Sequence, residues 1–322
     1  MIEDKFEIII PTKSINHLCL TAIRKIREIY PVVQITIVTD RLSDDLEDFQ
    51  NVKVIKTNST DTISKKRNSA VEKSNKTYIA FLDSDAYPHI NWLEDAIEKF
   101  QEYRDLGVIG GPNIFYENDD RESYFSYLAT KSFLLGGQNY QVNNNQIVNV
   151  KYVASSNMIV RRDVYTQLQG MNPELTTGED IDFCIRTHQY QYRVIYSDKC
   201  RVSHLTRNFS GFIKQRFVWG IGVIKVLKNT FPYYLGSIVP AMIIVLTLTL
   251  LLLGMFAPLL ILTLLYLSLC VYETKRTTSN AYEFYKVFKY IFTSIPLIGL
   301  GTCANIFIKD NYKIMRFYNN EK

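Results

Sequence analysis

Residues 6–111 alternate between short apolar runs, which predict strands, and longer amphipathic segments, which predict helices. Strands are predicted at 6–10, 34–38, 52–55, 78–82 and 108–111, and helices at 18–30, 62–74 and 90–103. This alternation with short connections indicates an α/β fold with a mainly parallel sheet and helices on both of its faces. Ligands of such sheets bind outside the carboxyl ends of the strands, so chemistry is expected there.

Two carboxylates one residue apart, Asp83 and Asp85, follow the apolar strand predicted at 78–82. Side chains i and i+2 at the end of a strand point the same way, so the pair could grip the divalent cation that a pyrophosphate-bearing substrate requires. Asp-x-Asp also occurs wherever a strand runs into a solvated turn. Thr12 and Asp40 follow two other predicted strands, and we expect these four polar residues to converge on one crevice.

Residues 233–272 run for 40 positions without a single Asp, Glu, Lys or Arg. A helix rises about 1.5 Å per residue and needs roughly 20 apolar residues to cross a bilayer, so this stretch is long enough for two crossings. Gly254 and Pro258 lie at its middle, where the chain would reverse. The pattern predicts a transmembrane helical hairpin, at about 234–253 and 256–272. A buried soluble helix rarely exceeds the length of one membrane span, which disfavours that alternative.

A third apolar segment, 290–308, contains Pro296 and two glycines and is flanked by Lys289 and Lys309. It fits a kinked span, a re-entrant element or a helix lying at the membrane interface. From residue 273 onward, 8 Lys+Arg against 4 Asp+Glu account for +4 of the formal net charge of +5. Basic residues on both sides of the segment disfavour a crossing, so a membrane-surface role is expected for this tail. The remaining chain is nearly neutral, which argues against nucleic acid binding.

The start of the chain, 1–5, leads straight into a strand with no apolar region behind a basic start, so no signal peptide is expected. The N-terminal domain is therefore expected in the cytoplasm. The five cysteines are scattered without a C-x-x-C spacing, which indicates reduced, packed thiols and not a metal or disulfide framework.

Seven short motifs follow one another along the chain. They are IIIPTKS from Ile8, IVTD from Ile37, SKKRNSAV from Ser64, FLDSDAYPHINWL from Phe81, ASSNMIVRRDVYTQLQGMNPEL from Ala154, TGEDIDFCIR from Thr177 and VSHL from Val202. In this order they resemble the inverting glycosyltransferases of family 2, which have a GT-A fold, a Rossmann-like α/β arrangement. The resemblance covers most of residues 6–220. It implies transfer of a sugar from a nucleoside-diphosphate donor with inversion at the anomeric carbon.

The resemblance also implies where the donor binds. The donor residues that it implies are Pro11, Thr12, Asp40, Arg67, Asn68, Asp83 and Ser84. Asp40 would accept hydrogen bonds from the base or the ribose, the alternative being a turn or capping role. Arg67 with Asn68 would lie near the base and the phosphates, because a guanidinium fork reaches oxygens in pairs. Their neighbours Lys65 and Lys66 are interpreted as solvated side chains.

A divalent metal belongs to the same implied site. By resemblance, Asp85 binds Mg²⁺ or Mn²⁺ directly, and Asp83 contacts the ribose and the metal. His204, after a strand-like stretch, matches a histidine that completes the metal shell or touches the diphosphate in some related enzymes, and structural packing is the open alternative. The metal would neutralise the leaving diphosphate.

A second acidic cluster precedes a helical pattern and supplies the expected base. Inverting transfer needs a carboxylate that removes the acceptor's hydroxyl proton as that oxygen attacks the anomeric carbon. By resemblance Asp180 is that base and Glu179 its neighbour, whereas Asp182 is interpreted as structural. The alternative is that these acids only favour a helix N-terminus.

The segment 209–232 is rich in aromatic and aliphatic residues and predicts an amphipathic helix lying against the bilayer. It contains KQRFVWG from Lys214, which resembles the Q-x-x-R-W element of membrane-embedded polysaccharide synthases. Gln215, Arg216 and Trp219 would contact the acceptor or the diphosphate. The match is broken because Val218 stands where the arginine is expected. Arg216 lies two residues earlier, and on a helix its side chain is rotated by about 200° from the expected position. Ordinary packing of the helix on the domain is the alternative.

Together these features predict a membrane-attached inverting hexosyltransferase of the inner membrane, multi-pass, with its catalytic domain in the cytoplasm. The predicted parts are a GT-A domain at 1–208 (halves 1–111 and 112–208), an interface helix at 209–232, a transmembrane hairpin at 233–272 and a basic tail at 273–322. A nucleoside-diphosphate sugar, UDP-linked more than GDP-linked, and a lipid-linked or polyprenyl-type acceptor are the expected partners, and a homo-oligomer is left open.

Two alternatives remain from the sequence. A processive polysaccharide synthase is disfavoured because one hairpin and one ambiguous segment offer few helices for a polymer channel, and because the Q-x-x-R-W pattern is broken. A non-catalytic nucleotide-sugar-binding assembly subunit is disfavoured because Asp83, Asp85 and Asp180 are all retained.

Overall fold

The computed structural model describes residues 2–42, 46, 49–116, 121–135 and 147–305. The chain divides into two compact units, one formed by 1–116 with 142–205 and the other by 117–141 with 206–322. The second unit therefore takes in 117–141, a stretch that the sequence interpretation assigns to the acceptor half of the GT-A domain. The basic residues after 305 and the end of the predicted segment 290–308 lie outside the described residues.

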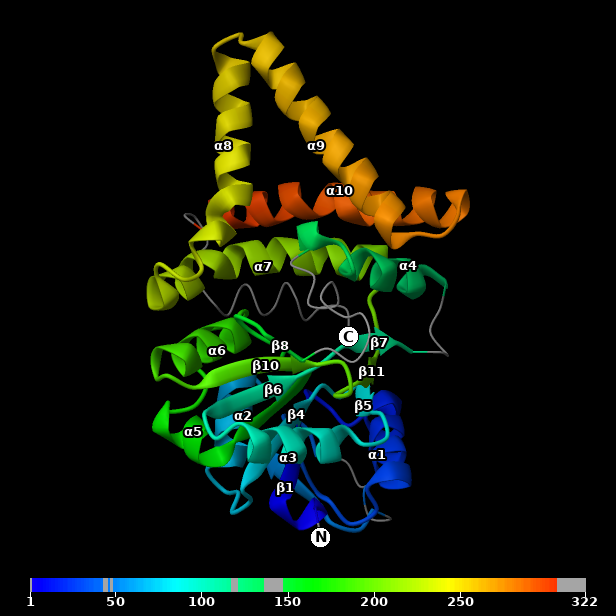
Figure 1. The fold of residues 1–322 in the computed structure, drawn as a ribbon, viewed down its shortest axis with the longest axis vertical. Coiled ribbons are helices and arrows are strands. Elements are labelled where there is room, and N and C mark those ends of the chain that lie inside the picture. Colours follow the sequence, from blue (N-terminus) through cyan, green and yellow to red (C-terminus); the bar gives the residue numbers. More distant parts are fainter. Residues whose placement is uncertain (1, 43–45, 47–48, 117–120, 136–146, 306–322) are drawn as a thin grey trace. The chain divides into compact units, whose positions relative to one another are not determined.

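The first unit is built on an eight-stranded sheet (Figure 1). Its strands, in spatial order, are β3 (Val52–Lys56), β2 (Gln34–Thr39), β1 (Phe6–Pro11), β4 (Tyr78–Leu82), β9 (Asn157–Arg161), β6 (Leu106–Gly110), β10 (Arg193–Ser197) and β8 (Ile147–Asn149). The first four are mutually parallel, and β10 is parallel to β6. Strand β9 runs antiparallel between β4 and β6, and β8 is antiparallel at the edge. The predicted α/β sheet is thus confirmed as mostly parallel, with β9 and β8 as exceptions.

Helices cover both faces of this sheet, which explains why its strands are continuously apolar. The helices of the first unit are α1 (His17–Ile29), α2 (Ile63–Val71), α3 (Trp92–Glu102), α5 (Arg162–Gln167) and α6 (Glu179–Gln189), after a short 3-10 turn, η1 (Glu3–Lys5). Ile8 of β1 belongs to one buried cluster with Ile23 of α1 and Trp92 of α3. The next residue, Ile9, belongs to another cluster with Phe183 of α6. Adjacent strand residues therefore fill opposite layers.

A small second sheet in the same unit has the order β5 (Ala86–Pro88), β11 (Val202–His204) and β7 (Asn113–Phe115). Strand β11 is antiparallel to β5 and parallel to β7. Because β5 starts directly after the Asp-x-Asp motif, this pairing sets β11 beside the carboxyl end of β4. The small sheet thus joins three segments that lie far apart in the sequence of the unit.

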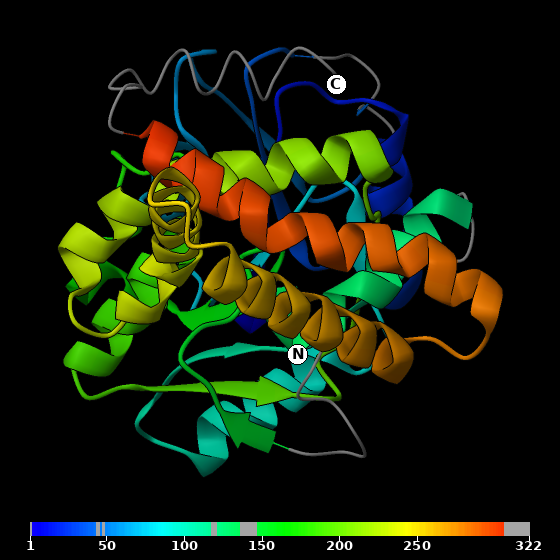
Figure 2. The same cartoon turned by 90° about the horizontal axis from the view of Figure 1, so that it is seen from above.

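The second unit is helical. Its elements are α4 (Arg121–Thr130), η2 (Phe133–Leu135), α7 (Phe209–Thr230), η4 (Leu235–Ile238), α8 (Val239–Leu252), α9 (Phe256–Thr277) and α10 (Ala281–Ala304). An aromatic cluster joins them, and it includes Phe125 of α4, Phe212 of α7 and Tyr290 of α10. Seen from above, α10 lies between α7 and α9 (Figure 2).

Three helical segments of this unit are long and apolar enough to cross a membrane: 235–252, 256–277 and 281–304. The predicted helical hairpin is confirmed as two helices joined at Gly254, and the predicted interface helix is α7. The third helix starts earlier than the predicted segment because Asn280 caps it, its side chain accepting a hydrogen bond from the Glu283 N–H. Pro296 lies inside this continuous helix.

Candidate active site

The acidic pair stands at the carboxyl end of β4, as the sequence predicts. The Ala86 N–H donates to the carbonyl of Asp83 at 3.1 Å, which closes a turn between β4 and β5. In the small sheet, Ala86 is paired with His204, and the Leu205 N–H donates to the Asp85 carbonyl at 3.2 Å. Backbone pairing therefore holds an imidazole beside two carboxylates that lie about 120 residues earlier in the chain.

These three side chains form a cluster that can hold a divalent cation. His204 Nε2 lies 3.4 Å from Asp85 Oδ1 and 3.6 Å from Asp83 Oδ2, and one ligand atom from each residue lies within 4.8 Å of the others. Neighbouring ligands of an octahedral ion bound at about 2.1 Å are roughly 3 Å apart, and opposite ligands roughly 4 Å, so the spacing fits one such ion. All three side chains are partly exposed, which leaves room for substrate oxygens.

A buried arginine connects the metal cluster to the second acidic pair. Arg67 of α2 is only 1% exposed, and its guanidinium donates to Glu179 Oε1 at 2.8 Å and to Asp83 Oδ1 at 3.3 Å. The other oxygen of Asp83 faces His204. The sequence interpretation directs Arg67 at the base and phosphates, whereas in this structure its two NH groups face carboxylates and Met171. Arg67 thereby offsets the charge of the two acids that it joins.

Asp40 is paired with a lysine that the sequence interpretation assigns to solvent. Lys66 Nζ lies 2.6 Å from Asp40 Oδ1 and donates to the Thr12 carbonyl at 2.7 Å. Both Lys66 and its partner carboxylate are largely buried. The interpretation of Lys66 as solvated was wrong, because one turn of α2 places Lys66 and Arg67 against two different strand ends. The helical spacing within SKKRN is a signal that could have shown this.

Two other implied donor residues, Thr12 and Asn68, form hydrogen bonds within the first unit. Thr12 donates its hydroxyl to the Ser14 carbonyl at 2.8 Å, directly after Pro11 at the end of β1. Asn68 Nδ2 donates to the Met171 carbonyl at 2.8 Å, and its Oδ1 accepts from the Met171 N–H at 3.0 Å. Asn68 therefore ties α2 to the loop that leads to α6. Ser84 lies between the two acids of the motif and is partly exposed.

Asp180 lies in the first turn of α6, which starts after Gly178 in a left-handed conformation with φ of 74°. Its Oδ2 accepts from the Ser155 N–H at 3.1 Å and its Oδ1 from the Ile181 N–H at 2.9 Å. Burial, and then the neighbouring charge of Glu179, raise the pKa of Asp180 to about 7. A carboxyl group with this pKa can exchange protons near neutral pH.

Asp182 has the structural role that the sequence suggests. It is fully buried, and its Oδ2 accepts from Arg186 at 2.8–2.9 Å. Arg186 also donates to the Leu168 carbonyl at 2.7 Å, so this pair fixes α6 to the preceding loop.

The remaining predicted residues, Gln215, Arg216 and Trp219, lie on α7 in the second unit. The guanidinium of Arg216 is buried between two rings, 4.5 Å from the centroid of Phe212 and 4.3 Å from that of Trp219. Cation–π contacts of this kind hold the arginine within its own helix.

Comparisons with known proteins agree with this site. The sequence model described as glycosyl transferase family group 2 matches residues 78–298, a stretch that includes Asp83, Asp85, Asp180 and His204. Glycosyltransferase AglE of Haloferax volcanii is 27% identical over 164 residues, covering 50% of this chain and 50% of that protein. Glucosyl-dolichyl phosphate glucuronosyltransferase of the same organism is 25% identical over 175 residues, covering 51% and 54%.

The cellulose synthase catalytic subunit of Pseudomonas fluorescens is 23% identical over 169 residues, covering 51% of this chain but 22% of that protein. The chain thus spans about half, or less, of the length of these curated relatives. Among solved structures, a mannosyltransferase from Pyrobaculum calidifontis in complex with GDP-Man and Mn²⁺ has a TM-score of 0.59 at 13% identity, covering 95% of this chain and 88% of that one. A structure of GalNAc-T7 with UDP, GalNAc and Mn²⁺ has a TM-score of 0.53 at 12% identity, covering 72% and 49%.

At these identities the solved structures establish the fold alone, and the family follows from the sequence match. Because that match extends over well more than half of the residues, this chain belongs to glycosyl transferase family group 2.

Proposed function

We propose that this protein transfers a sugar from a nucleoside-diphosphate donor to a lipid-linked or polyprenyl-type acceptor at a membrane, with inversion at the anomeric carbon. The observation that carries the proposal is one connected group of side chains. It runs from the cluster of Asp83, Asp85 and His204 through Arg67 to Glu179, and the charge of Glu179 acts on the carboxyl group of its neighbour in sequence, Asp180. A donor site and a base are both needed for inverting transfer, and this group offers both.

On the donor side, Asp40 is proposed to accept hydrogen bonds from the base or the ribose while Lys66 fixes its orientation. The metal, Mg²⁺ or Mn²⁺, would be held by Asp85, Asp83 and His204. When bound, it supplies positive charge against the diphosphate as that group leaves. A uridine donor is proposed, in line with the cellulose synthase relatives that are described as UDP-forming.

On the acceptor side, Asp180 is proposed to take the proton of the attacking hydroxyl. Its oxygens are oriented by the Ser155 and Ile181 N–H groups, and its pKa of about 7 suits proton removal at neutral pH. Arg67 forms an ion pair with Glu179. Because Glu179 is held in this pair, it does not compete with Asp180 as the base. The step forms the new glycosidic C–O bond, breaks the C–O bond to the diphosphate and moves one proton to Asp180.

A membrane location for the acceptor is supported by the apolar helices of the second unit and by a relative whose name includes dolichyl phosphate. We place the catalytic unit on the cytoplasmic face of the inner membrane, where nucleotide sugars are made. The second candidate function, processive polysaccharide synthesis, is favoured by the similarity to cellulose synthase subunits. Product length decides between them, because a processive enzyme gives long polymers and the proposed enzyme adds a limited number of sugars.

Binding of the donor part tests the proposal without knowledge of the sugar. The melting temperature of the full-length protein is measured with UDP and with GDP, each with Mn²⁺ and with EDTA. We expect stabilisation by a nucleoside diphosphate that requires Mn²⁺ and is lost in Asp85→Ala, whereas the control Asp105→Asn, altered at a half-exposed aspartate, behaves as the wild type. Metal-dependent stabilisation that persists in Asp85→Ala would contradict the assigned metal site.

A further inference from the structure

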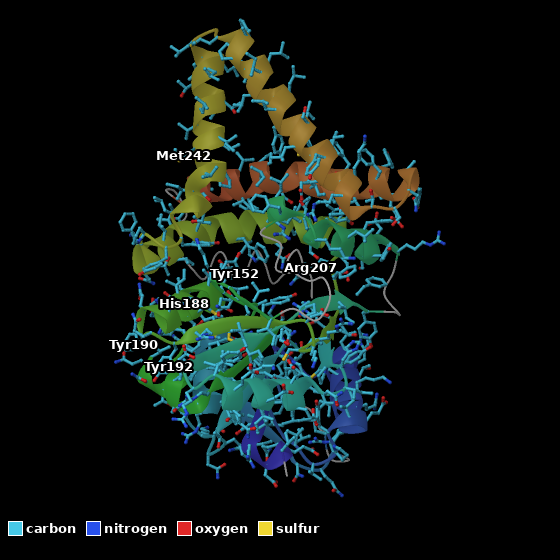
Figure 3. The ribbon with its side chains drawn as sticks, in the orientation of Figure 1. Tyr152, His188, Tyr190, Tyr192, Arg207 and Met242 are labelled. Carbon is cyan, nitrogen blue, oxygen red and sulfur yellow. The ribbon has the colours of Figure 1, made fainter. Side chains whose placement is uncertain are left out.

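The α8–α9 hairpin is apolar on all sides. Pro240 is the one buried residue in α8, and the helices carry outward-facing residues such as Met242 (Figure 3). The two helices stand across α7 and α10 and converge towards their turn (Figure 1). A surface with this composition is stable only in contact with hydrocarbon, which here means lipid acyl chains.

The hairpin is at the short end of the lengths that can cross a membrane. The apolar part of α9, 256–272, is 17 residues or about 25 Å long, and α8 has 14 residues, about 21 Å. With the 3-10 turn η4 added, which rises about 2 Å per residue, the first leg reaches 18 residues, about 29 Å. The hydrocarbon core of a bilayer is about 30 Å thick, so neither apolar leg exceeds it, and the divergence of the two helices shortens their reach along its normal. Because of this divergence, the turn falls short of the opposite surface.

The composition of the turn points the same way. Residues 250–262 contain no polar side chain, and Leu252 and Leu253 at the turn are 86% and 67% exposed. A hairpin that crossed completely would expose these leucines to headgroups and water on the far side. Turns at that level carry polar, Trp or Tyr residues in spanning proteins. This turn instead carries the side chains of a membrane interior.

Several backbone groups of the turn are hydrogen-bonded within the turn. Gly254, at φ of 64°, donates its N–H to the Leu251 carbonyl at 3.1 Å, and the Met255 N–H donates to the Leu250 carbonyl at 2.9 Å. This is a Schellman cap, which satisfies the carbonyls of Leu250 and Leu251 in the last turn of α8. At the start of α9, the Phe256 N–H donates to the Gly254 carbonyl at 3.0 Å, and the third residue of the helix is a proline without an N–H. An unpaired backbone group costs several kcal/mol in hydrocarbon, so these hydrogen bonds lower the cost of placing the turn there.

The polar groups of the second unit gather at the open end of the hairpin. Glu273 of α9 accepts from the Ser132 hydroxyl at 2.9 Å and from Arg276 at 2.9 Å. Helix α10 lies along α7 there, and the Thr302 hydroxyl donates to the Gly220 carbonyl at 3.1 Å. In Figure 1, α10 runs across the hairpin and not beside it, so it does not form a third parallel span.

From these observations we infer that the protein is anchored monotopically. The α8–α9 hairpin enters the bilayer from the side of α7 and α10, and its turn at Gly254 stays inside the hydrocarbon, in place of the two crossings that the sequence predicts. Both ends of the hairpin then lie on one membrane face. The inference deepens the membrane association of the proposed function and does not depend on sugar transfer.

Site-directed spin labelling tests the depth of the turn. A nitroxide is attached to Leu253→Cys and, as the aqueous reference, to Ser279→Cys, an exposed position between α9 and α10. The full-length protein is placed in phosphatidylethanolamine and phosphatidylglycerol vesicles, and the parent protein supplies the background from native cysteines. We expect oxygen to relax the label at 253 and a water-soluble nickel chelate to relax the label at 279. A membrane-impermeant maleimide is also added on both sides of the membrane. It should react with the cysteine at position 253 at least about tenfold more slowly than with the cysteine at position 279, because the bilayer core contains no water.

Labelling of position 253 from the side opposite Ser279 would show a complete crossing, and labelling from the same side would show that the hairpin is not inserted; either result overturns the inference. The measurement is repeated on Asp85→Ala. The depth of the turn should be the same in that variant, because the anchoring does not depend on the metal site. A failure of this inference can therefore be told apart from a failure of the proposed function.

A charge at the turn gives an independent test. In Leu253→Asp the short carboxylate cannot reach either surface from the hydrocarbon, so we expect carbonate washing to release this variant from membranes. The matched control Tyr233→Asp, at the open end of the hairpin and 53% exposed, should stay bound. Equal retention of the two variants would overturn the inference, because a turn in the far headgroups tolerates an aspartate.

Discussion

Replacing Asp180 with asparagine removes the titratable group while keeping its shape. Burial and Glu179 raise the pKa of Asp180 from 3.8 to about 7. One pKa unit corresponds to about 1.4 kcal/mol, so ionising this carboxyl costs the folded state up to about 4 kcal/mol relative to the unfolded chain. The side chain is partly exposed, which makes this figure an upper bound.

The sign of the pH dependence follows from where the proton is bound. Between pH 3.8 and about 7 the folded protein holds a proton on Asp180 that the unfolded chain has lost. The stability from this group is therefore complete below pH 3.8 and disappears as the pH rises through about 7. Between pH 5 and pH 8 the wild type should lose up to about 3 kcal/mol through this group, and Asp180→Asn should not.

The order of stability of the wild type and Asp180→Asn should therefore reverse between pH 5 and pH 8. At pH 5 the variant should be less stable by about 1 kcal/mol, because an amide nitrogen cannot accept the hydrogen bond of one neighbouring N–H. At pH 8 the variant should be the more stable of the two. Unfolding of the detergent-solubilised protein at pH 5, 6.5 and 8 measures this difference, with Asp105→Asn as a control at a half-exposed site.

The same variant tests whether Asp180 acts as the general base or only contributes to nucleotide binding. Asp180→Asn should bind the nucleotide within a few fold of the wild type, whereas transfer should fall by at least roughly 10²-fold, the contribution of a general base. In the wild type, transfer should rise with pH towards about 7 as Asp180 ionises. Parallel stability curves for the two proteins would refute the raised pKa. Turnover near that of the wild type would move the base elsewhere, with Glu179 the first candidate.

Further predictions address other contacts. Arg67→Met should lower the free energy of unfolding by about 3–5 kcal/mol, because it leaves the buried Glu179 unpaired; an unchanged melting curve would contradict this. His204→Ala should raise the Mn²⁺ concentration for half-maximal nucleotide binding at least about tenfold, as loss of a metal-site group does; titration of Mn²⁺ measures it. Gly301→Ala should destabilise by about 1–3 kcal/mol, since the new Cβ would lie 2.1 Å from a carbonyl of α7, while Gly236→Ala, with open space around it, should have little effect.

Much of the fold could be predicted because its signals are local. The alternation of strands and helices up to residue 111, the acidic pair after β4 and the 40 uncharged residues of the hairpin all appear in contiguous sequence. Strand β9 could not be predicted as antiparallel, because its four buried residues, Asn157 and the apolar residues 158–160, look the same in either direction. Strand direction depends on which neighbours a segment meets, and that is a tertiary property.

The candidate active site, like the fold, could be predicted only in part from the sequence. Periodicity places Asp83, Asp85 and Asp180 at element ends, but it does not show that a backbone ladder sets His204 beside the acids. It also does not show that Lys66 is buried against Asp40, because a lysine in a polar helix reads as solvated. Paired buried charges are decided by long-range packing, which a single sequence does not contain.

The stereochemistry of one transferred sugar tests the central claim most directly. Full-length protein in vesicles is given a nucleoside-diphosphate sugar labelled with ¹³C at its anomeric carbon, Mn²⁺ and a short lipid-linked glycan, which carries the acceptor hydroxyl. The anomeric coupling in the NMR spectrum of the product is compared with that of the donor. The proposed direct displacement with Asp180 as the base predicts a lipid-bound product of the opposite anomeric configuration. A product with the donor's own configuration would contradict the account.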